Sequence, residues 1–255
     1  MRTPRWSYLC IALLCLTAGA AAPAADISVE SARQIVARID QLRQPAGNLA
    51  ISARIATLDH GKEQDANNYA IRTDGGGNAL LEMLDVDTRG QKILSTAEGI
   101  WMYFPKTRRP IRLTPMQQLH GDAAIGDVLR ARWSGEYTVA SVDNAVTTVN
   151  DKNCILIVLN AAQDSSTYKR VDLYVAADSH LPVRAAFYTF GDKLLKYASF
   201  AEPATVSGHL LIARTSIANS RDEAQKKTTV YTVSALREAA ADKGLFTLHG
   251  LEVGR

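Results

Sequence analysis

The residues that most often carry metal or nucleophilic chemistry are few in this chain and lie far apart. Its five histidines stand singly, with neither a second histidine four residues away nor a nearby cysteine to complete a set of metal ligands. Two of the three cysteines lie within the first 15 residues, and Cys154 sits in an apolar run that favours a small buried side chain. We therefore expect no metal, no other cofactor and no disulfide.

Motifs for phosphate binding and acyl transfer are also missing. The sequence holds no Gly-x-Ser-x-Gly elbow and no Walker loop, and the glycines at 75–77 lack the lysine and the following helix of a phosphate site. Glu82, Asp85 and Asp87 alternate with apolar residues as solvated residues of a strand do, and no carboxylates are paired for acid–base catalysis. The sequence therefore predicts that the protein is not an enzyme.

The N-terminus has the pattern of a cleaved secretory signal. Arg2 and Arg5 form a positive region, an apolar core follows, and small residues offer a cleavage zone near Ala24 or Ala25. The apolar core is about half the length that a membrane-spanning helix needs. Residues 1–25 are thus expected to be a signal peptide, and residues 26–255 to be a single exported domain.

Behind the signal peptide, hydrophobic periodicity predicts one helix and then a series of strands. Apolar residues recur every three to four positions over residues 28–43, with Ser28 as the helix N-cap. From Ile51 onward the period changes to two, and the intervening turns are so short that antiparallel pairing is expected. A short, broken helical lid is expected over residues 115–133, and a further helix over residues 234–243. The fold class is therefore α+β with a dominant antiparallel sheet.

One predicted strand, residues 99–105, is apolar on both faces. Every second residue from Ile100 is apolar, and so are Trp101 and Tyr103 between them. A strand that is wet on one side alternates apolar and polar residues, so both faces of this strand are expected to be covered. Two interpretations stay open: a central strand between two core layers, or a strand with one face in an apolar cavity.

The aromatic strand begins a characteristic order of segments. The pattern comprises Trp-Met-Tyr-Phe-Pro at 101–105, Arg108 and Arg109, Ile111 and Arg112, the segment 121–127, Asp-Leu-Tyr-Val at 172–175, Leu-Pro-Val-Arg at 181–184 and two strands rich in Phe and Tyr. This order resembles the outer membrane lipoprotein-sorting protein family, the LolA-like periplasmic carriers. It is similar to the broader branch of that family rather than to the dedicated lipoprotein chaperone.

The resemblance implies a LolA/LppX-like fold, in which an antiparallel sheet curls into an incomplete β-barrel and helices cover its concave face. An open barrel leaves room for a ligand that a small closed barrel fills with side chains. The resemblance further implies a periplasmic carrier that moves a lipid or a lipoprotein acyl chain between membranes, with outer membrane lipoprotein sorting as its role. Its partners would be this cargo and an inner-membrane exporter or an outer-membrane acceptor protein. The open alternative is an envelope-stress sensor, or an accessory protein of an exporter, that binds an apolar signal.

Large apolar side chains of the aromatic strand, the lid and a later hairpin are the candidates for lining the cavity. They are Trp101, Tyr103, Met116, Leu119, Ile125, Leu129, Phe187, Tyr188, Tyr197 and Phe200. Which face of each strand looks inward is not fixed by the sequence. The candidates for contact with anionic headgroups or an acidic partner are Lys106, Arg108, Arg109 and Arg112, with a solvated turn as the alternative. The 29 basic and 26 acidic side chains nearly balance, so we expect no nucleic-acid binding.

The lid is expected to move. Gly121 and Gly126 lie within it, and glycine adopts backbone angles that other residues avoid. We expect a lid that rests closed over an empty cavity and opens for loading. A charge at Leu129 is expected to abolish binding while the fold survives.

Overall fold

The structure is a computed structural model that describes residues 26–130, 132–221 and 226–253. The expected signal peptide, residues 1–25, lies outside the described residues. The strands are β1 (Asn48–Asp59), β2 (Lys62–Asp74), β3 (Ala79–Met83), β4 (Lys92–Thr96), β5 (Gly99–Tyr103), β6 (Ile111–Leu113), β7 (Gln118–His120), β8 (Ala123–Ala124), β9 (Tyr137–Val149), β10 (Lys152–Ala161), β11 (Arg170–Ala176), β12 (Pro182–Tyr188), β13 (Leu194–Phe200), β14 (Ala204–Val206), β15 (His209–Leu211), β16 (Arg214–Asn219) and β17 (Lys227–Glu238). The helices are α1 (Val29–Arg43), α2 (Ile125–Leu129), α3 (Trp133–Glu136), the 3-10 helix η1 (Lys243–Phe246) and α4 (Leu248–Val253).

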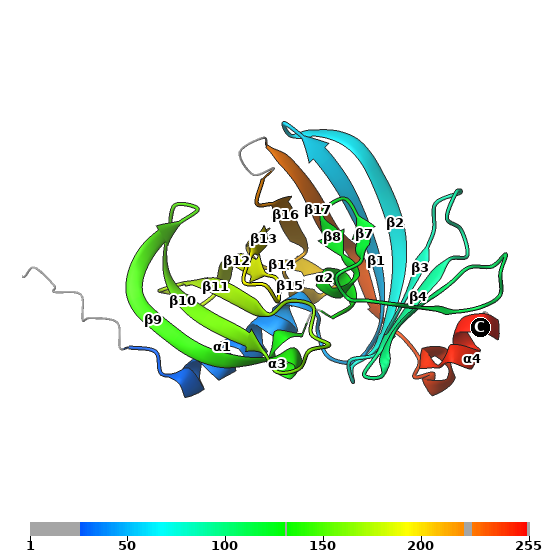
Figure 1. Cartoon of the computed structure of the whole chain (residues 1–255), viewed down its shortest axis with the longest axis horizontal. Helices are drawn as coiled ribbons and strands as arrows, with labels where there is room; N and C mark the ends of the chain where they lie inside the picture. The colour runs from blue at the N-terminus through cyan, green and yellow to red at the C-terminus, as the bar shows by residue number, and fades with distance from the viewer. Residues whose placement is uncertain (1–25, 131, 222–225, 254–255) are drawn as a thin grey trace, which may run out of the picture.

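A 13-stranded sheet forms the frame, in the order β6-β5-β4-β3-β2-β1-β17-β16-β13-β12-β11-β10-β9. Its strand pairs are antiparallel, and β6 and β9 are its two edges, which do not pair with each other. Figure 1 shows the two ends of the sheet as separate arms, with β7, β8 and α2 between them. The sheet is therefore an open half barrel, which confirms the expected fold class.

Helix α1 begins and ends as its sequence predicts. The Ser28 hydroxyl accepts a hydrogen bond from the backbone N–H of Ser31 at 3.1 Å, which satisfies one of the unpaired donors of the first turn. Ala32, Val36 and Ile39 form its buried face in the main hydrophobic cluster. This packing places the C-terminal end of α1, with Arg43, at the concave side of the sheet.

The expected helix over residues 234–243 is wrong. Strand β17 continues to Glu238 because its edge pairs with β1, where Leu236 lies opposite Ile51. The Ser234 hydroxyl donates to the backbone oxygen of Ser52 instead of capping a helix. Pairing with a long neighbouring strand thus overrides the helical preference of this segment.

The C-terminal helices cover the outer face of the sheet. Leu245 of η1 and Leu251 of α4 are buried against Leu80 of β3 and Leu94 of β4, in a cluster separate from the main core. Figure 1 shows α4 outside the arm that contains β3 and β4. The sheet therefore has a second apolar layer on this arm.

The segment expected to be a broken helical lid is only partly helical. It starts as the β7–β8 hairpin and continues as α2, of five residues, and α3, of four. Gly121 has φ +54°, and a Cβ there would lie 2.3 Å from Thr229 Oγ1. A Cβ at Gly126 would lie 2.2 Å from Thr167 Oγ1. These glycines let the segment pack closely against its neighbours, and the expected motion of the segment stays a prediction.

Replacing Gly126 with alanine is expected to destabilise the protein by about 1–3 kcal/mol, because the added methyl group overpacks the contact with Thr167. The double variant Gly126→Ala/Thr167→Ala should recover part of this loss, since it removes the two closest atoms. Gly135→Ala is the matched control, because a Cβ there meets nothing within 4 Å. Urea unfolding of the three variants measures the effect, and equal stability of Gly126→Ala and Gly135→Ala would contradict it.

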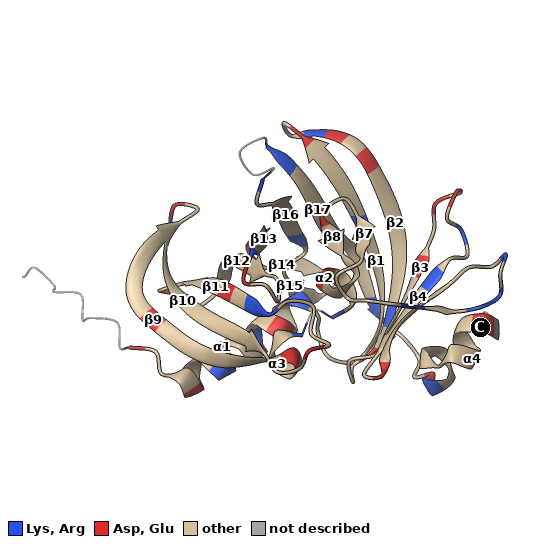
Figure 2. Ribbon diagram, viewed as in Figure 1, with Lys and Arg blue, Asp and Glu red and all other residues tan. Residues whose placement is uncertain are grey.

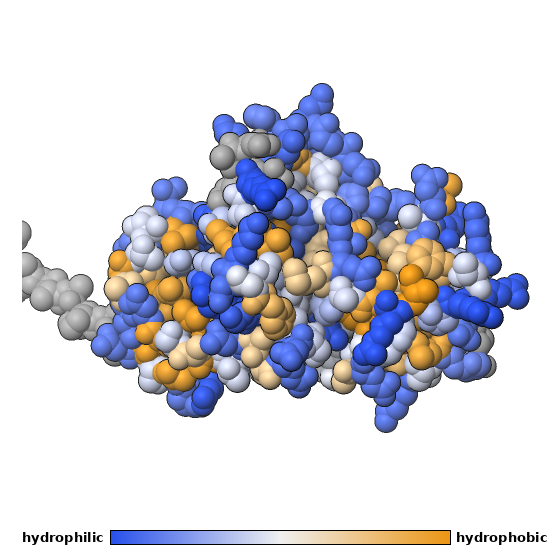
Figure 3. Space-filling model, in the orientation of Figure 1, coloured by the Kyte–Doolittle hydropathy of each residue, from blue (hydrophilic) through white to orange (hydrophobic). Residues whose placement is uncertain are grey.

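Apolar residues on the surface do not form one continuous patch in the face that Figure 3 shows. In the view of Figure 3, apolar side chains appear in several separate areas with hydrophilic residues between them. No helix among the described residues has both the length and the apolar character needed to cross a membrane.

Candidate functional site

An apolar cavity of about 40 Å³ lies on the concave side of the sheet. Its walls are mostly apolar side chains of β1, β2, β12, β13, β16 and β17, together with Val128 of α2. The polar side chains that reach it are Arg43, Gln44, Asp127, Thr215 and Tyr231. The cavity is thus an apolar chamber whose polar lining comes from the C-terminal end of α1, from α2 and from one residue each of β16 and β17.

The cavity is nearly filled by its own walls. About 10–15 Å³ of such volume holds one water, so the cavity has room for a few waters only. An acyl chain needs far more space. Any such ligand must move a wall, and α2 is a short segment that is not part of the sheet.

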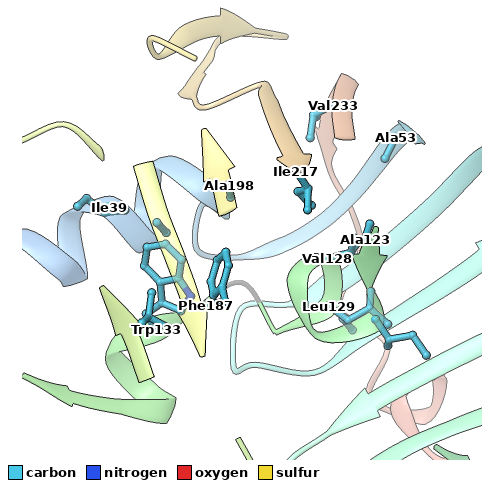
Figure 4. Packing of buried hydrophobic residues seen from close by; sticks show 14 of the residues in the cluster. Ile39, Ala53, Ala123, Val128, Leu129, Trp133, Phe187, Ala198, Ile217 and Val233 are labelled. Carbon is cyan, nitrogen blue, oxygen red and sulfur yellow. The ribbon is translucent and has the colours of Figure 1, made fainter. Parts of the chain in front are cut away.

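Aromatic rings form one wall of the chamber. Phe187 of β12 and Phe200 of β13 both line it, and Trp133 at the start of α3 lies behind them. The centroid of the Trp133 ring is 6.3 Å from that of the Phe187 ring and 5.9 Å from that of the Phe200 ring. Figure 4 shows Trp133 and Phe187 close together, with Val128 and Leu129 on the helix of α2. Of the sequence-predicted residues, Phe187 and Phe200 are thus at the cavity.

The predicted residues of α2 lie next to the cavity rather than in its lining. Ile125 and Leu129 are each 2% exposed and belong to the main core, while Val128 between them faces the chamber. A glutamate at Leu129 would therefore disrupt the core itself. The expectation that the fold survives this substitution is corrected.

Trp101 and Tyr103 lie on the outer face of the sheet, whereas the cavity lies on its concave face. They pack with Leu245 and the rest of the outer cluster under the C-terminal helices, whereas Ile100 of the same strand lies in the main core. The inner face of this strand therefore lies in the core. Its outer face is covered in part, and Trp101 also borders a separate cleft of about 400 Å³ with Phe246 and Leu248. The cover of the outer face comes from residues about 140 positions later, which the local pattern could not reveal.

Tyr188 and Tyr197 also point away from the cavity. Alternation along β12 turns Tyr188 outward when Phe187 points inward, and Tyr197 is three residues from Phe200, on the opposite face of β13. On the outer face the Arg170 guanidinium lies 3.8 Å from the Tyr188 ring centroid, and Arg184 lies 3.8 Å from that of Tyr197. These tyrosines belong to cation–π pairs of the outer face.

The two remaining lid residues lie to one side of the cavity. Leu119 is partly buried against the main core, and Met116 is 39% exposed. Met116 borders a separate cleft of about 240 Å³, together with Tyr168 and Lys196. Neither residue lines the apolar chamber.

The four basic candidates are remote from the chamber. Residues 106–109 are exposed in the loop between β5 and β6, where Figure 2 colours the ribbon blue for basic residues. Arg112 Nη2 donates to the backbone oxygen of Glu98 at 3.0 Å. Any role for these residues therefore concerns a surface contact and not the cavity.

A buried ion pair that the sequence analysis missed fastens α2 to the sheet. Lys196 Nζ lies 2.5 Å from Asp127 Oδ2, and these side chains are only 5% and 9% exposed. The Tyr168 hydroxyl donates to Asp127 Oδ1 at 2.7 Å, and the backbone N–H of Ala124 donates to Oδ2 at 2.8 Å. Burial, with Asp127 adjacent, raises the pKa of Tyr168 well above its usual value, so this hydroxyl stays a donor. The sequence offers one hint of this ion pair: alternation along β13 places Lys196 on the same face as the apolar residues Ala198 and Phe200.

Arg43 and its surroundings were also missed. The guanidinium carbon of Arg43 lies 3.9 Å from the ring centroid of Trp133. Beside it, Asp40 accepts hydrogen bonds from the backbone N–H groups of Trp133, at 2.8 Å, and Ser134, at 2.7 Å. Burial raises the pKa of Asp40 and lowers that of Arg43, and it raises the pKa of Tyr231 to about 12. The polar side of the cavity is therefore held in place by contacts between α1 and α3.

In the part of the chain that the structure describes, no group of three or more His, Cys, Asp or Glu residues is arranged to hold a metal ion. Cys154 is buried, and it forms no disulfide with any of these residues. Burial raises the pKa of its thiol, which disfavours the reactive thiolate.

The open antiparallel sheet of this chain is similar to the folds of solved proteins of the LolA superfamily. The chain superposes on a LolA superfamily protein from Nitrosomonas europaea with a TM-score of 0.73 and 24% identity, covering 85% of this chain and 97% of that one. An outer membrane lipoprotein-sorting protein domain from Vibrio parahaemolyticus gives a TM-score of 0.68, with 14% identity and coverage of 88% and 100%. A DUF1329 family protein from Desulfovibrio piger gives 0.67, with 19% identity and coverage of 88% and 98%.

At these identities the similarity establishes the fold, and it confirms the resemblance drawn from the sequence. The model of a family described as "Uncharacterized protein" matches residues 77–253, and the chain belongs to this family. A search of curated proteins finds no match.

Proposed function

We propose that this protein is a non-enzymatic periplasmic carrier that holds the acyl chain of a lipid or lipoprotein in its concave cavity and moves it between membranes. The observation that carries the proposal is the apolar chamber lined by Phe187, Phe200 and Val128 within an open half barrel. Burial of apolar surface stabilises a complex by about 25 cal/mol per Å², so an enclosed chain gains several kcal/mol without covalent chemistry. The similarity to an outer membrane lipoprotein-sorting domain supports the same role.

The proposal includes export and processing. Residues 1–25 act as a cleaved signal peptide, and residues 26–255 are a single domain that works in the periplasm. The exposed basic residues 106–109 are placed to meet anionic headgroups or an acidic exporter or acceptor protein.

Loading requires that α2 leave its place, because the chamber of about 40 Å³ is too small for a chain. We expect amides of α2 to exchange hydrogen faster than those of β1 in the free protein, since α2 has five residues and lies outside the sheet. A bound lipid should change the exchange of α2 and leave that of β1 unaltered. Equal protection of both, with and without lipid, would mean that α2 is fixed structure.

The experiment that tests the function is native mass spectrometry of the protein purified from the periplasm by gentle extraction, followed by titration with a fluorescent fatty-chain probe. We expect a co-purified amphiphile, which the probe displaces from a single site. Trp101→Ala is the matched control and should change probe affinity by no more than about threefold, because Trp101 lies on the outer face. If neither a ligand nor probe binding is found, the carrier function is refuted.

A further inference from the structure

We infer that a polar cleft beside the apolar chamber binds the head of the cargo, that this head carries an anionic phosphate, and that Arg132 is its ionic contact. The inference rests on the proposed carrier function and specifies its ligand class. The cleft has a volume of about 430 Å³. It lies between the α2–α3 segment, the turn between β2 and β3, the end of β4 and the loop between β10 and β11.

The α2–α3 segment separates this cleft from the chamber. Gln44, directly after α1, lines both hollows. In α2, Val128 faces the chamber, and the next residue, Leu129, borders the cleft. In α3, Trp133 packs against the rings of the chamber wall, and the next residue, Ser134, borders the cleft. A ligand whose chain enters the chamber as α2 moves can therefore place its head in the cleft.

Of the two arginines in the cleft, Arg132 is the better placed to bind a ligand. Its Nη2 is buried and has no hydrogen-bond partner among the described residues. Folded proteins pair nearly all buried polar groups, so such a donor points to an acceptor from outside the chain. Arg130 is engaged instead, because its Nη1 donates to the backbone oxygen of Ser165 at 3.0 Å and lies 3.6 Å from Glu136 Oε1. Arg132 follows α2 by three residues, so the movement of α2 that admits the chain also uncovers this nitrogen for the head.

The charges of the cleft favour a negative head. Among the described residues that line it, Arg130 and Arg132 are basic and Glu136 is the one carboxylate. Burial raises the pKa of Glu136, which weakens the negative charge that opposes an anion. The cleft therefore carries an excess of positive charge, and a guanidinium binds the oxygens of an anion as a bidentate pair.

The size and the donors of the cleft favour a phosphate over a carboxylate. A volume of about 430 Å³ falls within the range of small-molecule sites, whereas a carboxylate adds only two oxygens to the end of a chain. The side-chain amides of Gln44 and Gln163 also line the cleft and supply N–H donors for further oxygens. A phosphate head has these additional oxygens.

Binding of monododecyl phosphate, of dodecanol and of inorganic phosphate tests the inference at pH 7, where the phosphates are anionic. Both amphiphiles are kept below the concentrations at which they form micelles. We expect monododecyl phosphate to bind the unaltered protein at least about tenfold more tightly than dodecanol, and about 100-fold or more tightly than inorganic phosphate. In Arg132→Gln the preference over dodecanol should disappear through weaker binding of monododecyl phosphate, while dodecanol binding changes by no more than about threefold. Dodecanol binding also shows that the variant is folded.

Arg170→Gln is the matched control, because Arg170 is also half-buried but stacks on Tyr188 at 3.8 Å on the outer face, and its loss should leave the preference unchanged. Equal affinities for the two amphiphiles in the unaltered protein, or a preference that persists in Arg132→Gln, would overturn the inference and leave the carrier function standing. Equal weakening of both amphiphiles in Arg132→Gln would overturn it as well. Binding of inorganic phosphate as tight as that of monododecyl phosphate would also overturn it, because the cleft would then be a site for free phosphate. Absence of binding by either amphiphile would refute the carrier function, and the inference with it.

Discussion

Replacing Lys196 with methionine is expected to lower the free energy of unfolding by about 3–5 kcal/mol, because it leaves the Asp127 carboxylate buried without its cation. Methionine preserves the length and most of the volume of the lysine stem, so the lost charge dominates the effect. Tyr168 and the backbone of Ala124 still donate to Asp127, and α2 should loosen rather than detach. Chemical denaturation monitored by tryptophan fluorescence measures the change.

Two further variants separate the ion pair from simple packing. The double variant Lys196→Met/Asp127→Asn should regain at least half of the loss, because removing both charges leaves no unpaired ion in the interior. Lys169→Met is the matched control: its partner Asp192 is exposed, and the change in stability should be close to the error of measurement. A large loss in Lys169→Met, or none in Lys196→Met, would contradict this account of α2.

Replacing Phe200 with glutamate is expected to reduce the affinity for a fatty-chain probe by about 100-fold or more, because a charge in an apolar chamber opposes burial of the chain. The new carboxylate would lie near Arg43, whose guanidinium carbon is 5.9 Å from the Phe200 ring. Pairing with Arg43 would limit the loss of stability.

The control for Phe200→Glu is a glutamate on the other face of the same strand. Tyr197→Glu places the same charge three residues earlier in β13, beside Arg184 on the outer face. Probe binding by fluorescence titration should be unchanged in Tyr197→Glu. If both variants lose binding, or neither does, the concave chamber is not the binding site.

Local periodicity correctly predicted those helices and strands whose pattern of apolar residues fits only one type of secondary structure. The strand predicted within residues 99–105 forms β5, and Ser28 caps α1, because strand patterning and capping are properties of neighbouring residues. Residues 234–238 instead extend β17, because pairing with β1 outweighs their helical preference. An element that depends on a distant partner could thus be mistaken.

The site was less predictable for the same reason. A strand that is apolar on both faces does not reveal which face looks toward the cavity. Trp101 was therefore placed at the cavity, whereas it lies on the outer face of the sheet. Phe187 and Tyr188 are adjacent, and alternation allows only one of them to point inward. Asp127 and Lys196 are 69 residues apart, and only the curl of the sheet brings them together.

The most direct test of the proposed site uses the two tryptophans outside the expected signal peptide. Trp133 lies against the residues that line the chamber, and Trp101 lies on the outer face. Bromine quenches tryptophan fluorescence only at short range, so fatty acids brominated at successive chain positions report which tryptophan the cargo approaches. With residues 1–25 removed, Trp101→Phe retains Trp133, and its fluorescence should be quenched by bound cargo. Trp133→Phe retains Trp101, which should remain unquenched; quenching of Trp101 with none of Trp133 would contradict a binding site in the concave cavity.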